Sequence, residues 1–380
     1  FDLVAFLVVN AGRVVSKDEI IAAVWGGRIV SDSAISTRIA AARRALGDDG
    51  ATQKFIKTIH GRGFRFDMRP QFSAMKQVTD RKSNAAFDPQ LPSLADQSPI
   101  QYFESYDGAS IAHCSVGDGH PVVFSGSWMS HLEQDWDNPG WGPYVRHLAA
   151  HFELIRYDLR GNGMSGWENI DISFDKMVDD LECTIDTYGH EKVSIFGGSQ
   201  GAAVALAYAI RQPHRVSRLV LYGGYPRGRK CRGNPEAIAE SEALVTLIRQ
   251  GWARDNPAIR QQVTAMFMPH ATQDEVRWFN EFQRACAPAE NVARFRQVFD
   301  EIDVSSVLGK VVQPTLIVHA RGDVVAPLSE AKMMASRIKN SQLVILNSDS
   351  HMNFENDHEF PKFMGSIVDF LNEGSSARAD

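Results

Sequence analysis

The chain has 380 residues, of which 44% are hydrophobic and 23% charged, and its formal net charge is −6. This length predicts two domains rather than one core, and the negative charge argues against nucleic-acid binding by the chain as a whole. We expect neither a membrane span nor a signal peptide. Four scattered cysteines without metal-ligand spacing favour reduced thiols and a cytoplasmic location.

The first 70 residues predict three short helices and a hairpin. An apolar run over residues 3–9 predicts the first helix, and a capping box over Ser16–Glu19 begins the second. Apolar residues at helical spacing over residues 31–46 predict the third helix. Residues 55–66 alternate around a Gly-Arg-Gly turn, which predicts a β-hairpin. Three helices followed by a hairpin are the pattern of a winged helix.

This region resembles the winged-helix effector domain of bacterial two-component response regulators. The matching phrases are Gly12–Glu19, Ala23–Gly26, Val30–Asp32, Arg43–Asp48 and Ile56–Phe66. In that family the third helix enters the major groove, and the wing contacts phosphate or the minor groove. The resemblance therefore implies double-stranded DNA as a partner. The basic side chains expected to contact it are Arg38, Arg44, Lys57, Arg62 and Arg65.

Further features of this region bear on DNA binding. Basic side chains outnumber acidic ones by eleven to seven in residues 1–70, although acidic residues dominate the whole chain, and this asymmetry favours a DNA-facing domain. Against it, Ala40 and Ala41 stand where longer polar side chains are expected at the base-facing surface. The small N-terminal sheet of the family has no counterpart here, so we expect the domain to be N-terminally truncated. A vestigial winged helix is the alternative.

Residues 71–99 lack periodicity and contain three prolines, which predicts a linker. Residues 100–375 alternate apolar strands with amphipathic helices, so we expect an α/β fold with a mostly parallel sheet covered on both faces. The expected strands are 101–106, 110–116, 121–124, 153–157, 193–196, 218–222, 314–319 and 342–346, and the expected helices 141–152, 174–188, 202–210 and 360–371. Residues 227–304 predict helices without a strand, which indicates an inserted helical cap.

Ser199 lies in the most informative stretch of the chain. An apolar strand over Val193–Phe196 leads into a Gly-x-Ser-x-Gly motif, and an alanine-rich helix follows. This context predicts a strained strand-to-helix turn that presents the serine hydroxyl at the helix N-terminus. Only small residues at Gly197 and Gly201 let the two elements pack so closely. Backbone N–H groups and the helix dipole at this point favour a developing oxyanion.

Residues 100–375 are similar to the α/β-hydrolase fold, and most of all to its esterase-like members. The matching phrases are Trp128–Glu133, Asp158–Ser165 and Arg218–Gly224. In that family a nucleophile, an acid and a histidine follow one another along the chain. The resemblance implies a triad of Ser199, Asp323 and His351, the last two each following a predicted strand. Serine needs the imidazole to take its proton, and a carboxylate fixes the imidazole tautomer.

The resemblance also implies an oxyanion hole of two backbone N–H groups. One belongs to Gln200, directly after the nucleophile, and the other to Trp128, or to Ser127 if the loop is counted differently. Two nearby residues are left out of the site. His319 lies inside a predicted strand, where packing in the core is more usual, and Asp349, the rival acid, lies only two residues before His351.

The sequence therefore predicts a serine hydrolase that cleaves carboxylic esters of small molecules through an acyl-enzyme, without a metal or organic cofactor. Cleavage of thioester, lactone, amide or carbon–carbon bonds, and perhydrolysis, are open on the same triad. The alternative is a transcription regulator whose hydrolase-like domain senses or degrades a small ligand. A homodimer is also left open, because no periodic seam in the sequence predicts one.

Overall fold

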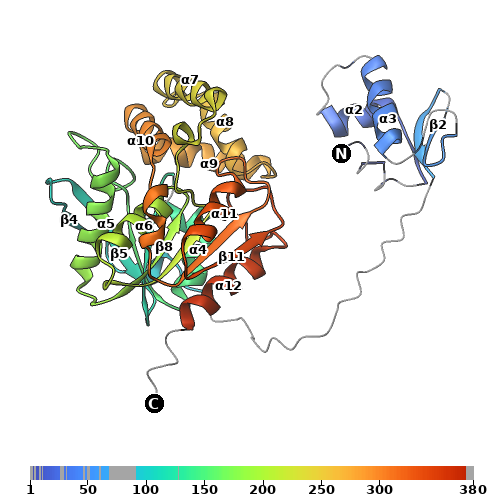
Figure 1. Ribbon diagram of the computed structural model, residues 1–380. Coiled ribbons are helices and arrows are strands. Elements are labelled where there is room, and N and C mark those ends of the chain that lie inside the picture. Colours follow the sequence, from blue (N-terminus) through green and yellow to red (C-terminus); the bar gives the residue numbers. More distant parts are fainter. Residues whose placement is uncertain are drawn as a thin grey trace. The chain divides into compact units, whose positions relative to one another are not determined.

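A computed structural model of the chain shows two compact units, Phe1–Ala86 and Phe87–Asp380 (Figure 1). The structure describes residues 3, 6–7, 10, 12–25, 30, 32–45, 48, 52–59, 61–67, 91–126 and 128–373. Within these ranges, no helix is both long and apolar enough to cross a lipid bilayer. The four cysteines lie in the larger unit as free thiols, three of them buried.

The smaller unit combines helices with a three-stranded antiparallel sheet. Its elements are β1 (Val14–Val15), α2 (Lys17–Trp25), α3 (Asp32–Ala45), β2 (Ile56–Ile59) and β3 (Gly63–Phe66), and the strands pair in the order β1-β3-β2. The predicted capping box is confirmed, because Ser16 Oγ accepts the N–H of Glu19 at 3.2 Å and Glu19 Oε2 accepts the N–H of Ser16 at 2.8 Å. The predicted hairpin is β2–β3. Strand β1 was not predicted, because it is too short to show the alternation of apolar and polar residues that marks a strand.

Apolar side chains from the helices and the sheet fill the core of the smaller unit. Ile35 and Ile39 of α3 are buried there, as their spacing predicts, together with Leu3 and Leu7. Leu46 and several residues of the predicted first helix lie outside the described part of the chain. The core is therefore assembled around α3, the helix expected to face DNA.

Two polar residues tie the hairpin to α3. The guanidinium of Arg43 donates to the carbonyl of Ile56 at 2.8 Å and to Thr58 Oγ1 at 2.9 Å. The carboxylate of Asp48 accepts the backbone N–H groups of residues 54, 55 and 56. Buried polar groups need such partners. Arg43 and Asp48 therefore support the fold of this unit.

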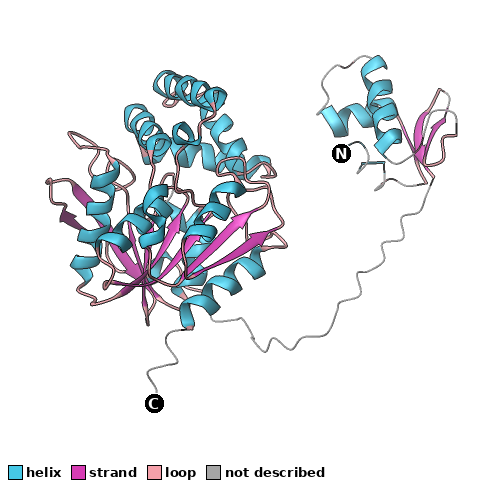
Figure 2. Ribbon diagram, viewed as in Figure 1, coloured by secondary structure: helices cyan, strands magenta, loops and turns pink. Residues whose placement is uncertain are grey.

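The larger unit is built on an eight-stranded sheet. In chain order the strands are β4 (Gln101–Glu104), β5 (Ser110–Val116), β6 (Pro121–Ser125), β7 (Glu153–Tyr157), β8 (Val193–Gly198), β9 (Val216–Tyr222), β10 (Thr315–Ala320) and β11 (Ser341–Leu346). Figure 2 shows this sheet, whose spatial order is β11-β10-β9-β8-β6-β7-β5-β4. Strands β6 to β11 pair in parallel, and only the edge formed by β4 and β5 is antiparallel. The sheet is therefore mostly parallel, as predicted.

Helices flank this sheet and also form a separate group beside it (Figure 2). The flanking helices are α4 (Gly142–Ala149), α5 (Phe174–Tyr188), α6 (Gly201–Arg211), α11 (Leu328–Arg337) and α12 (Phe360–Asn372). Of these, α11 was not predicted. The separate group, called the cap below, contains α7 (Pro235–Gly251), α8 (Ala258–Phe267), α9 (Gln273–Cys286) and α10 (Ala289–Glu301). An antiparallel bridge between Arg227 and Asp303 joins the two ends of this insertion.

The end of the predicted linker is anchored on the larger unit. The backbone N–H of Ser98 donates to the carbonyl of Ser115 at 2.8 Å, and Ser98 Oγ accepts the N–H of Ser115 at 2.9 Å. Gln97 Oε1 accepts hydrogen bonds from Trp136 Nε1 and from Arg156 Nη1. The sequence analysis placed these residues in the linker, because isolated side-chain contacts produce no periodic pattern in a sequence. Residues 71–90 of the predicted linker lie outside the described residues.

Candidate active site

Ser199 lies at the sharp turn between β8 and α6. Its φ of 52° is in the left-handed region, which residues other than glycine rarely adopt. The turn is tight on both sides, because a Cβ at Gly197 would lie 2.8 Å from Ala202 Cα, and a Cβ at Gly201 would lie 2.3 Å from the carbonyl oxygen of Ser125. These contacts explain why the motif needs its two glycines.

Asp323 and His351 meet at the carboxyl ends of β10 and β11. His351 Nδ1 lies 2.6 Å from Asp323 Oδ2, and both side chains are buried. The other carboxylate oxygen, Asp323 Oδ1, accepts the backbone N–H groups of Val325 at 2.8 Å and Ala326 at 3.0 Å. The carboxylate is thus held by the loop that follows β10, and it fixes the orientation of the imidazole ring.

The charge of Asp323 is stabilised by its surroundings. Burial alone raises the pKa of a carboxyl group, but His351, then His319 and the backbone N–H of Ala326, hold the pKa of Asp323 below its ordinary value. An ionised Asp323 accepts the Nδ1–H of His351. The second ring nitrogen, Nε2, is then free to accept a proton.

Ser199 and His351 line one small cavity under the cap. Its volume is about 20 Å³, which is room for about one water molecule. Aromatic side chains dominate its wall, and the lining residues are Phe124, Trp141, Tyr144, Phe196, Gly198, Ser199, Tyr222, Phe267, His351 and Met352. The arrangement therefore brings a hydroxyl and an imidazole–carboxylate pair together against a mostly apolar wall.

The two residues expected to donate to an oxyanion lie in different loops, because Gln200 directly follows Ser199 at the N-cap of α6 and Trp128 follows β6. Among the described residues, the backbone N–H of neither Gln200 nor Trp128 donates to a backbone carbonyl. The side-chain amide of Gln200 donates from Nε2 to the carbonyl of Gly126 at 3.2 Å, which joins the turn at Ser199 to the loop after β6. Ser127, the alternative donor, lies outside the described residues.

Neither His319 nor Asp349 is part of the Asp323–His351 pair, as the sequence analysis expected. His319 is buried in β10, where its Nε2 donates to the carbonyl of Ala326 at 2.7 Å. Burial lowers the pKa of His319. Asp349 is exposed, and its carboxylate lies 2.8 Å from Nε2 of His270, a residue of the cap. Asp349 therefore orients His270 and not the buried histidine.

Sequence reasoning missed the cap residue that holds His351. The carbonyl of Phe267, at the end of α8, accepts the backbone N–H groups of His351 at 3.1 Å and Met352 at 3.3 Å. The Phe267 ring packs edge-to-face on the His351 ring, with centroids 5.0 Å apart. The cap also reaches the loop after β6, because Trp128 Nε1 donates to Gln283 Oε1 at 3.0 Å. No local sequence signal marks such contacts, since each joins distant parts of the chain.

The smaller unit presents some of the predicted DNA-contacting side chains and pairs others internally. Arg38 on α3 and Arg62 on the turn of the hairpin are exposed. Lys57 and Arg65 both bind the carboxylate of Asp67, with Lys57 Nζ 2.6 Å from Asp67 Oδ2. These hydrogen bonds, from Arg65 first and then Lys57, lower the pKa of Asp67 to about 2. The side chain of Arg44 lies outside the described residues.

Comparison with known families identifies both units. Residues 135–357 match the model of the family described as "alpha/beta hydrolase fold". Residues 1–66 match the family described as "Transcriptional regulatory protein, C terminal". These matches confirm the predicted fold classes, an α/β-hydrolase fold preceded by a winged-helix domain.

Relatives and solved structures agree with the larger match. The chain is 27% identical over 280 residues to the AB hydrolase superfamily protein YisY of Bacillus subtilis, covering 71% of this chain and 98% of that protein. It is 26% identical over 269 residues to a pimeloyl-[acyl-carrier protein] methyl ester esterase of Nitrosomonas europaea, covering 69% of this chain and 100% of the relative. The solved esterase EaEST of Exiguobacterium antarcticum superposes with a TM-score of 0.62 at 22% identity, covering 72% of this chain and 99% of that one.

Proposed function

The chain belongs to the alpha/beta hydrolase family, and from this premise we propose that it is a serine hydrolase that cleaves carboxylic esters of small molecules. The observation that carries the proposal is the 2.6 Å contact between His351 Nδ1 and Asp323 Oδ2 beside a cavity that Ser199 and His351 share. A serine nucleophile with an imidazole base and an orienting carboxylate is the machinery of acyl transfer.

The reaction begins with attack by Ser199 Oγ on the carbonyl carbon of the ester, while His351 Nε2 takes the hydroxyl proton. Asp323 stabilises the imidazolium that forms. The backbone N–H groups of Gln200 and Trp128 donate to the oxyanion of the tetrahedral intermediate. Collapse of the intermediate expels the alcohol, which receives its proton from His351, and leaves an acyl group on Ser199.

Water completes the reaction by the same steps. His351 takes a proton from a water molecule, which attacks the acyl carbon, and the second tetrahedral intermediate releases the carboxylic acid and regenerates Ser199. The apolar lining of the cavity strengthens each of these charge interactions by excluding other water. Every step uses side chains and backbone groups of this chain.

Hydrolysis of a chain-length series of nitrophenyl acyl esters tests the proposal. The intact protein should release nitrophenol, and Ser199→Ala should reduce the rate to the background level while the protein stays folded. The acyl length with the highest kcat/KM would report the size of the binding space. A folded protein without activity on any ester of the series would contradict ester hydrolysis.

A second proposal concerns residues 1–66, whose family match favours DNA binding. We propose that these residues bind double-stranded DNA, so that the chain is a transcription regulator whose hydrolase domain degrades or senses a small ligand. Arg38 and Arg62 are exposed cations on α3 and the hairpin turn. Binding should weaken as salt rises, because phosphate contacts release counterions. Titration of duplex DNA at several salt concentrations provides the test, and a lack of binding at low salt would contradict it.

A further inference from the structure

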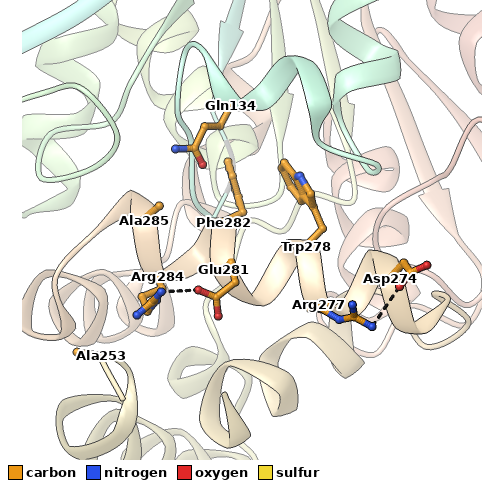
Figure 3. Close-up of a pocket in the computed structure, with 9 residues that line it drawn as sticks. All are labelled: Gln134, Ala253, Asp274, Arg277, Trp278, Glu281, Phe282, Arg284 and Ala285. Carbon is orange, nitrogen blue, oxygen red and sulfur yellow. Dashed lines mark ion pairs between the residues drawn. The ribbon is translucent and has the colours of Figure 1, made fainter. Parts of the chain in front are cut away.

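A groove lies on the surface between the cap and the sheet-bearing part of the larger unit. Its volume is about 810 Å³, and its lining residues are Gln134, Ala253, Asp274, Arg277, Trp278, Glu281, Phe282, Arg284 and Ala285. Most of these belong to α9 of the cap, whereas Gln134 opens the short helix η2 (Gln134–Asp137). Figure 3 shows Trp278 and Phe282 pointing from α9 toward the segment that carries Gln134. A volume of this size is typical of small-molecule sites.

The groove and the cavity at Ser199 share one aromatic wall. Trp141 lines the cavity, and its ring packs edge-to-face on the ring of Phe282, with centroids 6.0 Å apart. Phe282 lines the groove and stacks on Trp278, with centroids 5.1 Å apart. The Phe282 ring therefore lies between Trp278 of the groove and Trp141 of the cavity wall.

The cavity has to widen for an ester to reach Ser199. The cavity, at about 20 Å³, has no room for an acyl group and its leaving group. The opposite side of the cap is tied down, because the Phe267 carbonyl holds His351 and Met352, and His270 binds Asp349. Movement there would displace the histidine needed for catalysis.

Helix α9 is also anchored, so the Phe282 side chain is the part of this wall that can move without releasing the helix. Gln283, the next residue, accepts from Trp128 and donates to Thr264 Oγ1 at 2.9 Å. Displacing the whole helix would break both contacts, whereas rotation of the Phe282 ring into the groove breaks neither. The groove has the volume to receive that ring.

The charged residues of the groove are already paired with one another. Arg284 Nη2 lies 2.6 Å from Glu281, and Arg277 Nη2 lies 3.2 Å from Asp274, as the dashed lines in Figure 3 show. Both of its arginines thus have a carboxylate partner within the lining. The Trp278 ring, which is only partly buried and stacks on the buried Phe282 ring, is the remaining apolar surface of the lining, and it suits a flat, neutral, apolar group.

We propose that this groove binds a neutral aryl or similarly flat apolar group of the ester, stacked on Trp278, and that Phe282 is the gate between the groove and Ser199. The proposal rests on the ester hydrolysis proposed above and adds the substrate class and the residues that select it. Trp278 contributes to binding, and Phe282 controls access to the reacting serine.

Binding to an uncleaving protein tests the groove separately from the chemistry. Calorimetry measures the binding of 1-naphthyl acetate to three proteins that all carry Ser199→Ala: this single variant, and its combinations with Trp278→Ala and with Trp167→Ala. Trp167→Ala is the control, because it removes another partly exposed tryptophan that lies outside the groove. We expect Trp278→Ala to raise Kd about tenfold or more and Trp167→Ala to leave it unchanged. Equal affinity in all three proteins, or tighter binding of the negatively charged naphthyl hemisuccinate, would overturn the groove assignment. If 1-naphthyl acetate binds as expected but the protein that retains Ser199 hydrolyses no ester, the result would count against the proposed ester chemistry and not against the groove.

The gate is tested by the rate at which methanesulfonyl fluoride, a small serine reagent, modifies Ser199 in the otherwise unaltered protein. Phe282→Ala should speed modification about tenfold, because the wall no longer closes. Phe279→Ala is the matched control, since Phe279 also packs on Trp141, at 5.7 Å, but does not line the groove. Leucine variants replace the alanine variants where thermal unfolding shows that alanine disrupts the cap. Equal rates for the variants at positions 279 and 282 would contradict the gate.

Discussion

The backbone carbonyl of Phe267 lies 3.1 Å from the backbone nitrogen of His351, so the end of a cap helix holds the loop that carries the histidine of the proposed triad. In addition, the Phe267 ring packs against the imidazole. This contact from the cap therefore fixes the position of the His351 side chain. A shift of this end of α8 would therefore also move the loop that carries His351.

The first prediction separates the two candidate acids. Asp323→Asn should lower kcat for ester hydrolysis by about 10³-fold or more with little change in KM, because the amide no longer fixes the imidazole tautomer or stabilises the imidazolium. Asp349→Asn should stay within about twofold of the parent, since Asp349 is exposed and binds His270. Steady-state kinetics on one nitrophenyl ester measures both. A large loss in Asp349→Asn with an active Asp323→Asn would reverse the assignment.

The second prediction follows from the backbone at Ser199, whose φ is 52°. Both Ser199→Gly and Ser199→Ala should be inactive, but the glycine variant should be the more stable of the two by about 1 kcal/mol, since glycine adopts this conformation without strain. Thermal unfolding of the two variants gives the comparison. At Ser366, in the middle of α12, the same pair should show the opposite order, because glycine destabilises a helix interior. The same order at both positions would contradict the strain at Ser199.

These residues also show what the sequence could reveal. The turn at Ser199 and the capping box at Ser16 were predictable because each is a local pattern, complete within a few residues. Asp323 and His351 were proposed from the order of the triad residues along the chain in a known family, and the structure shows their side chains in contact. The contact of Phe267 with His351 and that of Gln283 with Trp128 could not be found in this way, because each pairs a cap residue with a loop far away in sequence and involves a backbone carbonyl or an amide with no distinctive pattern.

The third prediction concerns the pH dependence of the smaller unit. Hydrogen bonds, first from the backbone of Ser16 and then from the side chain of Arg13, lower the pKa of Glu19 from 4.5 to about 2. A carboxyl group with a lowered folded-state pKa stabilises the fold above pH 4.5, and this contribution disappears as the pH falls through about 2. Glu19→Gln should therefore increase hydrogen exchange in α2 near neutral pH and match the parent near pH 2. Asp18→Asn, in the same first turn, is the control, and a difference in Glu19→Gln that persists unchanged at low pH would contradict this account.

The last prediction concerns the hairpin wing of the smaller unit. There Asp67 forms ion pairs with Lys57 and Arg65, two of the cations expected to contact DNA. If residues 1–66 bind duplex DNA as proposed, Asp67→Asn should strengthen binding, because it releases both cations and removes a negative charge that repels phosphate. Each new phosphate contact should steepen the slope of log K against log salt by about 0.9. Arg62→Ala should change both quantities in the opposite direction. Asp18→Asn removes the same formal charge from another part of the unit, so an equal gain in that variant would show a general charge effect and count against the wing as the contact surface.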